Sequence, residues 1–277
     1  MQRARVLVVG LGEVGSAVYE VLGESGRFEV YGYDVDPARS AHRLEEVPRP
    51  IDYLHVAIPY SPSFNRAVER YAAELKPRAI FVHSTVAPGT TRTLHEALGL
   101  PVAYTPVRGR HPRLKEHLLF WPKWVSTLPS AFLGEAAKHL EEAGFKVRPC
   151  RDSPESLELA KLWETVYRAV MIAAWQELHR IARERGASLK VIAEFVGEVH
   201  EVLRDRPVYY PDFIGGHCLI PNTEILRSVH PSKLFDFVIE SNERRRREAE
   251  DPEVRREIED VKSYFLKLTK ADYYGAR

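Results

Sequence analysis

Continuous apolar runs of strand length alternate with amphipathic stretches over the first half of the chain. The runs lie at residues 5–10, 28–33, 52–58, 79–84, 101–104 and 123–128. Stretches with helical spacing, such as residues 62–75, separate them. A strand that is apolar on both faces must be covered by helices on both sides. The alternation therefore predicts an α/β fold built on a doubly wound parallel sheet.

The second half of the chain carries helix patterns and no strand pattern. Ser153, Pro154 and Glu155 form a helix start, and apolar residues then recur at helical spacing to about residue 185. The apolar positions exceed one stripe, so we expect a homodimer through this long helix, residues 155–185. The predicted domains are a sheet domain at residues 1–150 and an all-helical domain with a long central helix at residues 151–277.

A glycine motif follows the first predicted strand and opens the first predicted helix. Its residues are Gly10, Leu11, Gly12, Glu13, Val14 and Gly15, and Asp34 stands 19 positions after the last of them. Such glycines allow a tight turn, close approach of the backbone to a pyrophosphate, and tight helix–sheet packing. The helix N-terminus then offers amide groups to the phosphates. The pattern predicts a Rossmann domain that binds NAD, with Asp34 on the ribose disfavouring the 2′-phosphate of NADP.

Composition narrows the remaining possibilities. The 277 residues carry a formal net charge of +1, and no apolar run exceeds strand length, so we expect neither a nucleic-acid partner nor a membrane partner. Two cysteines, Cys150 and Cys218, make no disulfide framework and no metal site, which fits a reducing cytoplasm. Scarce Gln, Asn, Met and Cys beside abundant Arg resemble the composition of thermophile proteins.

Two polar segments stand out as candidate chemistry. Cys218 lies in the glycine-flanked stretch FIGGHCLIPN, residues 213–222. It is either a buried structural thiol or a nucleophile that needs access and close backbone approach. A second segment, residues 105–117, gathers basic residues: Arg108, Arg110, His111, Arg113 and Lys115. These residues either bind an anionic substrate at the carboxyl edge of the sheet or pair with acids elsewhere.

Four motifs in order resemble the UDP-glucose/GDP-mannose dehydrogenase family. They are GLGEVG, STVAPGT at residues 84–90, ELAKLWETVYRAVMIAAWQEL at 158–178, and GGHCLIPN at 215–222. The resemblance runs to about residue 230. It implies a Rossmann domain, a central dimer helix and a second Rossmann-like domain, with two NAD-dependent oxidations of a sugar hydroxymethyl through a cysteine-bound intermediate.

The resemblance assigns roles to single residues. By similarity Cys218 is the nucleophile, Lys161 stabilises developing oxyanion charge, and Thr85 meets nicotinamide and water. Ser84 and Thr85 are also candidates for capping the following helix. The strand ends add Ile58, Pro59, Ser84 and Thr85 to the expected cofactor contacts. His217 joins Arg108, Arg110 and His111 as expected anion ligands.

Departures from the family pattern change the expected chemistry. Thr165 stands where the family has asparagine, and Asn222 stands where it has aspartate. The segment TPVRGRHPRLKEH replaces the family's S-P-E segment, whose glutamates are thought to activate hydrolytic water, and fewer than sixty residues follow the cysteine loop. Without a positioned base a thioester is hydrolysed roughly 10²–10⁴-fold more slowly. The departures make four-electron oxidation of a UDP-sugar doubtful.

Three functions remain open on these observations. The first is a compact NAD-dependent dehydrogenase that oxidises an anionic alcohol or sugar phosphate, with Cys218, Lys161, Thr85, Asn222 and Thr165 as catalytic candidates. The second is a two-electron enzyme that works like the β-hydroxyacid dehydrogenases and uses Lys161 alone. The third is a non-catalytic NAD-binding module that acts as a dimer.

Overall fold

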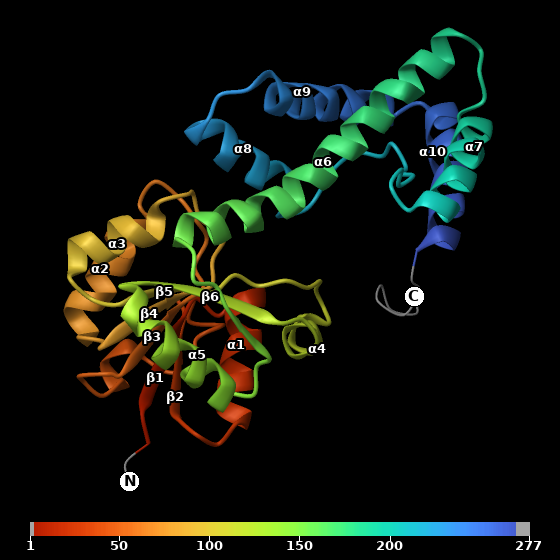
Figure 1. The fold of residues 1–277 in the computed structure, drawn as a ribbon. Coiled ribbons are helices and arrows are strands. Elements are labelled where there is room, and N and C mark those ends of the chain that lie inside the picture. Colours follow the sequence, from red (N-terminus) through yellow and green to blue (C-terminus); the bar gives the residue numbers. More distant parts are fainter. Residues whose placement is uncertain (1–2, 270–277) are drawn as a thin grey trace. The chain divides into compact units, whose positions relative to one another are not determined.

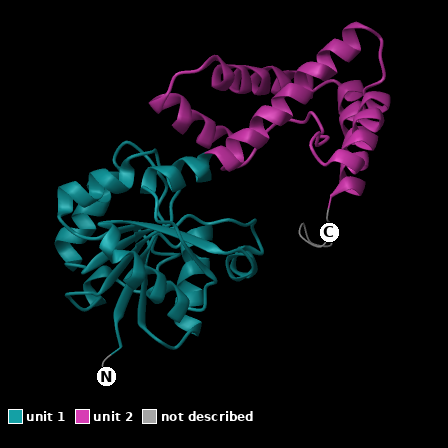
Figure 2. Cartoon of the chain, viewed as in Figure 1, with its two compact units in different colours: residues 1–162 teal, residues 163–277 magenta. Residues whose placement is uncertain are grey.

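The computed structural model describes residues 3–269 of the chain. It divides into two compact units, residues 1–162 and 163–277, which Figure 2 colours separately. The division falls inside one long helix, α6 (Pro154–Glu184), and so lies further along the chain than the predicted boundary after residue 150.

Unit 1 is built on a seven-stranded sheet with the order β2-β1-β3-β4-β5-β6-β7. The strands are β1 Arg5–Val9, β2 Glu29–Tyr33, β3 Tyr53–Val56, β4 Ala79–Val82, β5 Val102–Tyr104, β6 Lys123–Leu128 and β7 Val147–Pro149. The first five are parallel, β6 runs antiparallel to β5, and β7 runs parallel to β6. The strand order reverses at β1, so the crevice of a doubly wound sheet lies at the carboxyl ends of β1 and β3.

Helices cover both faces of this sheet because both faces are apolar (Figure 1). Val6 and Val8 of β1 pack with α1 (Glu13–Glu24), α4 (Leu114–Phe120) and α5 (Leu133–Glu142). Leu7 and Val9 pack on the other face with α2 (Phe64–Leu75) and α3 (Thr90–Leu98). Two short 3₁₀ turns, Leu44–Glu46 and Ser130–Phe132, complete the unit. The predicted doubly wound Rossmann fold is confirmed.

A chain of three imidazoles crosses the core of unit 1. His55 Nδ1 lies 2.8 Å from His83 Nε2, and His55 Nε2 lies 2.9 Å from His139 Nε2. Burial lowers the pKa of all three rings, that of His139 to about 3. The rings are therefore neutral, and the central His55 donates from one ring nitrogen and accepts at the other.

The regular secondary structure in the described part of unit 2 is all helical. It contains most of α6, then α7 (Leu189–Leu203), α8 (Leu219–Val229), α9 (Lys233–Glu248) and α10 (Pro252–Leu268). Helix α6 runs for 31 residues, which confirms the predicted long helix. Helix α7 begins at Leu189, with the Ser188 hydroxyl accepting the Val191 N–H. None of the helices between residues 3 and 269 combines the length and apolar character needed to cross a bilayer.

The mixed-charge segment of α9 and α10 is partly internal. Arg245 of α9 is only 1% exposed. Its guanidinium donates to the Gln176 carbonyl at 3.1 Å and lies 2.9 Å from His179 Nδ1. A guanidinium is buried when neighbouring acceptors replace its water shell, and here α6 provides them.

Candidate functional site

The glycine loop after β1 has the geometry of a dinucleotide turn. Gly10 has a φ of +87°, which an L side chain rarely adopts, and a Cβ there would meet the Ala57 backbone at 2.8 Å. A Cβ on Gly15 would lie 1.6 Å from the Gly10 carbonyl oxygen, so α1 packs directly on the turn. A Cβ on Gly12 would meet no protein atom within 4 Å. The protein thus needs glycine at 10 and 15, whereas the space at Gly12 is open for a ligand.

The other residues of the motif hold the loop in place. Leu11 is buried in the core, and Val14 packs against the same cluster. Glu13 opens α1 with its carboxylate half exposed. Ser16 donates from its hydroxyl to the Leu11 carbonyl at 2.8 Å. The N-terminus of α1 therefore has a fixed backbone at the carboxyl edge of the sheet.

Asp34 ties the end of β2 to the glycine loop. One carboxylate oxygen accepts the Leu11 N–H at 2.6 Å, and the other accepts the Asp36 N–H at 2.9 Å. A carboxylate has about four acceptor positions, so two remain for ribose hydroxyls. The neighbouring Val35 is 73% exposed. Arg39, the nearest candidate for pairing with a 2′-phosphate, instead forms an ion pair with Asp36 at 3.4 Å.

The ends of β3 and β4 line the next part of this edge. The Ser84 hydroxyl donates to the Ile58 carbonyl at 2.6 Å and joins the two strand ends. The built Cβ of Gly10 lies 2.9 Å from a methyl group of Ile58, so Ile58 borders the glycine turn. Pro59 is exposed and Thr85 is half-buried. Helix α3 begins at Thr90 with Gly89 as N-cap, so neither Ser84 nor Thr85 caps it.

Glu158, to which sequence reasoning gave no role, caps α3 from the start of α6. Its fully buried carboxylate accepts the Gly89 N–H at 2.7 Å, the Thr91 N–H at 2.9 Å and the Thr91 hydroxyl at 2.6 Å. Burial raises the pKa of Glu158 and these hydrogen bonds oppose that shift. The contact fixes the first turns of α6 to unit 1. Lys161 follows one turn later and is therefore held at this edge of the sheet.

A buried lysine at the same edge was also missed. Lys123 begins β6 and is 3% exposed, and its ammonium donates to the Thr105 carbonyl at 3.1 Å. Burial lowers its pKa to about 7, and the positive charges of Arg108 and Lys161 add to that effect. Three basic groups thus gather near the carboxyl ends of the strands. The only sequence signal was a lysine at the start of an otherwise apolar strand.

The basic residues of the loop, Arg108 to Lys115, differ in their contacts. Arg113 pairs with Glu116 at 2.6 Å, and Lys115 pairs with Glu20 at 3.4 Å. His111 lies 3.8 Å from Glu13 at the start of α1. Arg108 donates to the Pro122 carbonyl at 2.6 Å and lies over the Trp121 ring. Arg110 is exposed, with its backbone N–H on His117 Nδ1.

In unit 2, Cys218 is exposed at the N-cap of α8. Its thiol makes no capping hydrogen bond. Gly216 has a φ of +84°, so this position requires glycine, and His217 is exposed between the two. A helix N-terminus offers amide groups and positive dipole to a thiolate. The reading of Cys218 as a buried structural thiol is thereby excluded. The described residues contain no His, Cys, Asp and Glu group arranged to hold a metal.

The two departures from the family pattern in this region meet each other. The Asn222 side-chain amide, 5% exposed, donates to the Thr165 hydroxyl at 2.8 Å. The Asn222 backbone N–H donates to the Cys218 carbonyl at 2.9 Å, so the amide lies one helical turn beyond the thiol. The structure thus joins Thr165, Asn222 and Cys218 in unit 2, while Lys161 and the predicted cofactor residues lie in unit 1.

The helical segment matches a family model. Residues 155–244 match the model described as "UDP-glucose/GDP-mannose dehydrogenase family, central domain". This match supports the resemblance inferred from the sequence motifs over the segment that contains Lys161 and Cys218.

Individual relatives agree in fold. The UDP-N-acetyl-D-mannosamine dehydrogenase of Methanocaldococcus jannaschii is 23% identical over 259 residues, and the match covers 78% of this chain and 59% of that protein. The UDP-D-ManNAc dehydrogenase structure from Pyrococcus horikoshii has a TM-score of 0.73 at 21% identity, covering 87% of this chain and 68% of its own. The Mycobacterium tuberculosis 3-hydroxyisobutyrate dehydrogenase gives a TM-score of 0.63 at 17% identity, covering 90% and 95%.

Proposed function

We propose that the protein is an NAD-dependent dehydrogenase that oxidises a CH–OH group of a small anionic substrate. The observation that carries this proposal is the loop of Gly10, Gly12 and Gly15, open to solvent at Gly12 and tied to Asp34 through the Leu11 N–H. The amides of this loop would hold the pyrophosphate, and Asp34 would hold the adenosine ribose. Bound NAD supplies the hydride acceptor.

Lys161 is the proposed acid–base group in unit 1. Glu158 anchors its helix to α3, which gives the lysine a fixed position at the carboxyl edge of the sheet. Its amine would take the proton of the substrate hydroxyl, or its ammonium would stabilise the developing oxyanion. Thr85, half-buried after β4, is the proposed hydroxyl beside the nicotinamide.

The anionic substrate is supported by the charges around that position. The positive charges of Arg108 and Lys161 both lower the pKa of the buried Lys123, so these three basic groups lie close together. A cluster of cations favours a phosphate or carboxylate. Arg110 and His111 continue the basic surface along the loop, and His217 is the proposed counterpart in unit 2.

Cys218 is the proposed nucleophile of a second step. Its exposed thiol at the start of α8 would add to the carbonyl carbon of the aldehyde product, and Thr165 and Asn222 would position it. Oxidation of this adduct by a second NAD would give a thioester, which water would cleave to the carboxylate and the free thiol. The Cys218→Ala variant separates this proposal from two-electron chemistry. Loss of carboxylate product with aldehyde formation retained supports the nucleophile, and unchanged products contradict it. Cys150, which is half-buried, is the control thiol in alkylation time courses at neutral pH.

A second candidate is a two-electron hydroxyacid dehydrogenase that uses Lys161 alone. The specific observation in its favour is the mutual coverage with 3-hydroxyisobutyrate dehydrogenase, 90% of this chain and 95% of the other, whereas the curated relative is covered over 59% of its length. Under this candidate Lys161→Ala abolishes oxidation and Cys218→Ala does not. Tight NAD binding without turnover of any hydroxyacid or sugar phosphate would favour the non-catalytic module.

Cofactor choice tests the proposal directly. NADH and NADPH are titrated by fluorescence against the wild type, Asp34→Asn and Asp52→Asn. Asp52 is the matched control because its carboxylate also accepts a strand N–H, from Arg5 at 2.8 Å. We expect the wild type to prefer NADH, Asp34→Asn to reduce that preference, and Asp52→Asn to leave it unchanged. Equal affinities in the wild type would contradict the role of Asp34.

A further inference from the structure

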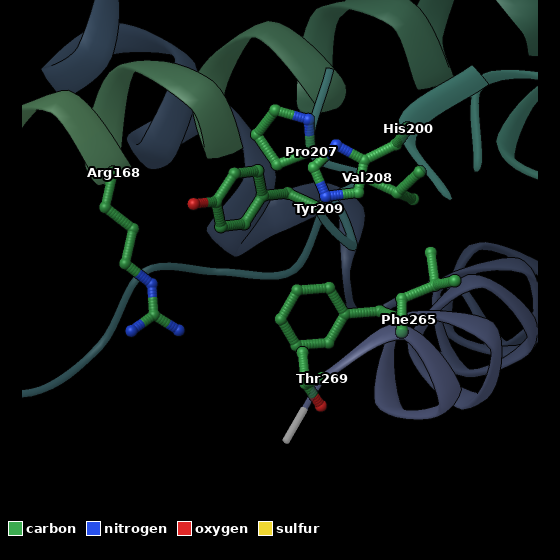
Figure 3. A pocket seen from close by; sticks show the side chains of 8 residues that line it. Arg168, His200, Pro207, Val208, Tyr209, Phe265 and Thr269 are labelled. Atoms are coloured by element: carbon green, nitrogen blue, oxygen red, sulfur yellow. The ribbon is translucent and has the colours of Figure 1, made fainter. Parts of the chain in front are cut away.

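The segment that connects α7 to α8, residues 204–218, forms neither helix nor strand. The backbone groups of such a segment need partners outside a regular ladder. Its first part packs against α10: Figure 3 shows Pro207 and Tyr209 beside Phe265, and the Tyr209 and Phe265 rings stack with centroids 5.9 Å apart. Its second part, residues 212–214, is held by buried side-chain amides instead.

The side-chain amide of Asn242 on α9 pairs with the backbone of Ile214. Its Oδ1 accepts the Ile214 N–H at 2.7 Å, and its Nδ2 donates to the Ile214 carbonyl at 3.1 Å. Both residues are buried, with Asn242 only 2% exposed. The amide thus supplies both of the hydrogen bonds that a neighbouring strand would give to this residue. Ile214 therefore has a fixed backbone against α9.

Gln176 of α6 holds the residue two positions earlier. It is fully buried, and its Nε2 donates to the Asp212 carbonyl at 2.8 Å. The neighbouring groups determine the orientation of this amide. Because a guanidinium can only donate, the Ser241 hydroxyl accepts from Arg180 at 3.0 Å and gives its own proton to Gln176 Oε1 at 2.7 Å. The donor atom Nε2 is therefore directed at the Asp212 carbonyl, which can only accept.

Beyond Ile214 the chain is open until α8 begins. Residues 215–218 are all exposed, and the first two are glycines. On the other side of Cys218, the Asn222 amide ties the first turn of α8 to Thr165 of α6. The exposed thiol therefore lies between two buried amide contacts, one at Ile214 and one at Asn222.

We infer that Asn242 and Gln176 are positioning residues that fix the backbone of residues 212–214 and thereby set the place of the Cys218 thiol. They act on the thiol through the backbone, across the two glycines of the loop. The consequence for catalysis rests on the proposed role of Cys218 as nucleophile. Misplacing a reacting group by about 1 Å costs about a hundredfold in rate, so Asn242→Leu should slow carboxylate formation by about that factor and leave NADH affinity unchanged.

Spin-label distance measurements test the positioning without turnover. In a Cys150→Ser background, one nitroxide is attached to Cys218 and the other to a cysteine introduced by Arg247→Cys at an exposed position of α9. We expect a narrow distance distribution in this parent protein. Loss of the amide contacts should open the segment locally and make the distribution about twofold broader or more in Asn242→Leu and in Gln176→Met. Glu243→Leu, an exposed neighbour on α9, is the matched control and should leave the width unchanged.

Hydrogen exchange at the Ile214 amide adds a test by rescue. Asn242→Asp keeps an oxygen that accepts the Ile214 N–H, so the amide should stay protected. Asn242→Leu should exchange about tenfold faster, the usual effect of losing one hydrogen bond.

Three results overturn the inference. They are an unchanged distance distribution in folded Asn242→Leu and Gln176→Met, equal broadening in Glu243→Leu, and equally fast exchange in Asn242→Asp and Asn242→Leu. The products of Cys218→Ala are measured separately. Failure of the nucleophile proposal would therefore show in that variant, and the distance distributions would still decide the positioning.

Discussion

Substitution of Gly12 tests cofactor binding separately from folding. Its backbone has a φ of −71° and a ψ of −163°, which any residue adopts, and its added Cβ meets no protein atom. Gly12→Val should therefore fold. Loss of a favourable N-cap residue costs up to about 1 kcal/mol, and reduced freedom of the unfolded chain offsets part of it. We expect the free energy of unfolding to change by less than about 1 kcal/mol.

The same substitution should remove cofactor binding. A valine side chain occupies the space through which the backbone approaches the pyrophosphate. Each charge-assisted hydrogen bond lost there weakens binding by about tenfold to a hundredfold, so the loss of two gives at least about a hundredfold. Gly15→Ala should behave differently. Its Cβ would lie 1.6 Å from the Gly10 carbonyl oxygen, a backbone atom that cannot swing away, so this variant loses stability as well.

Urea unfolding and NADH fluorescence titration measure the two effects on the same samples. Gly23→Ala is the control, since Gly23 lies in α1, is exposed, and has open space at its Cβ position. It should gain about 0.5–1 kcal/mol from helix propensity and bind NADH as the wild type does. The reasoning is refuted if Gly12→Val binds NADH normally, or if it unfolds as readily as Gly15→Ala.

Three further predictions follow from buried or exposed side chains. Burial lowers the pKa of Lys123 from 10.5 to about 7, so between these pH values the unfolded state binds more protons than the folded state and the free energy of unfolding rises with pH. In urea unfolding, Lys123→Met should lose this rise, whereas the exposed Lys138→Met should keep it. A pH profile of Lys123→Met identical to that of the wild type would contradict the prediction. Glu158→Gln leaves backbone donors facing an amide and should cost about 1–3 kcal/mol in urea unfolding, against under about 1 kcal/mol for Glu155→Gln on the same helix. Phe195 of α7 is 72% exposed, and we expect it to extend the homodimer surface of α6, so Phe195→Glu should sediment as a monomer; a wild-type monomer would refute the dimer.

The local sequence pattern was sufficient to predict the elements that are buried on both faces. The six predicted strands and the long helix all form, because an apolar run such as residues 5–9 leaves a chain little alternative to a central strand. Strand β7 (Val147–Pro149) was missed because it is short, mostly exposed and ends in proline. The antiparallel direction of β6 was also missed, since its sequence looks the same in either direction.

The site was predictable only where a motif is local. The glycine loop and Asp34 lie within one strand–helix–strand segment, so spacing alone indicated their role. Glu158 accepts backbone N–H groups from residues 67 and 69 positions away. No local sequence pattern identifies a capping acid at that separation. Lys123, His55 and His83 are polar residues inside or beside apolar strands. Such interruptions indicate a buried partner, but only the folded chain identifies it.

The pairing of Thr165 with Asn222 gives the two departures from the family pattern a common cause. Read along the sequence they are two separate losses, 57 residues apart. In the folded unit the buried Asn222 amide donates to the half-buried Thr165 hydroxyl at 2.8 Å, so changing either residue removes this hydrogen bond. A carboxylate at position 222 would place a negative charge beside the Thr165 hydroxyl, which carries no positive charge to balance it. An amide rather than a carboxylate therefore lies one helical turn beyond the exposed Cys218 thiol, and this accessibility makes Cys218, rather than the half-buried Cys150, the cysteine to follow in any search for a covalent step.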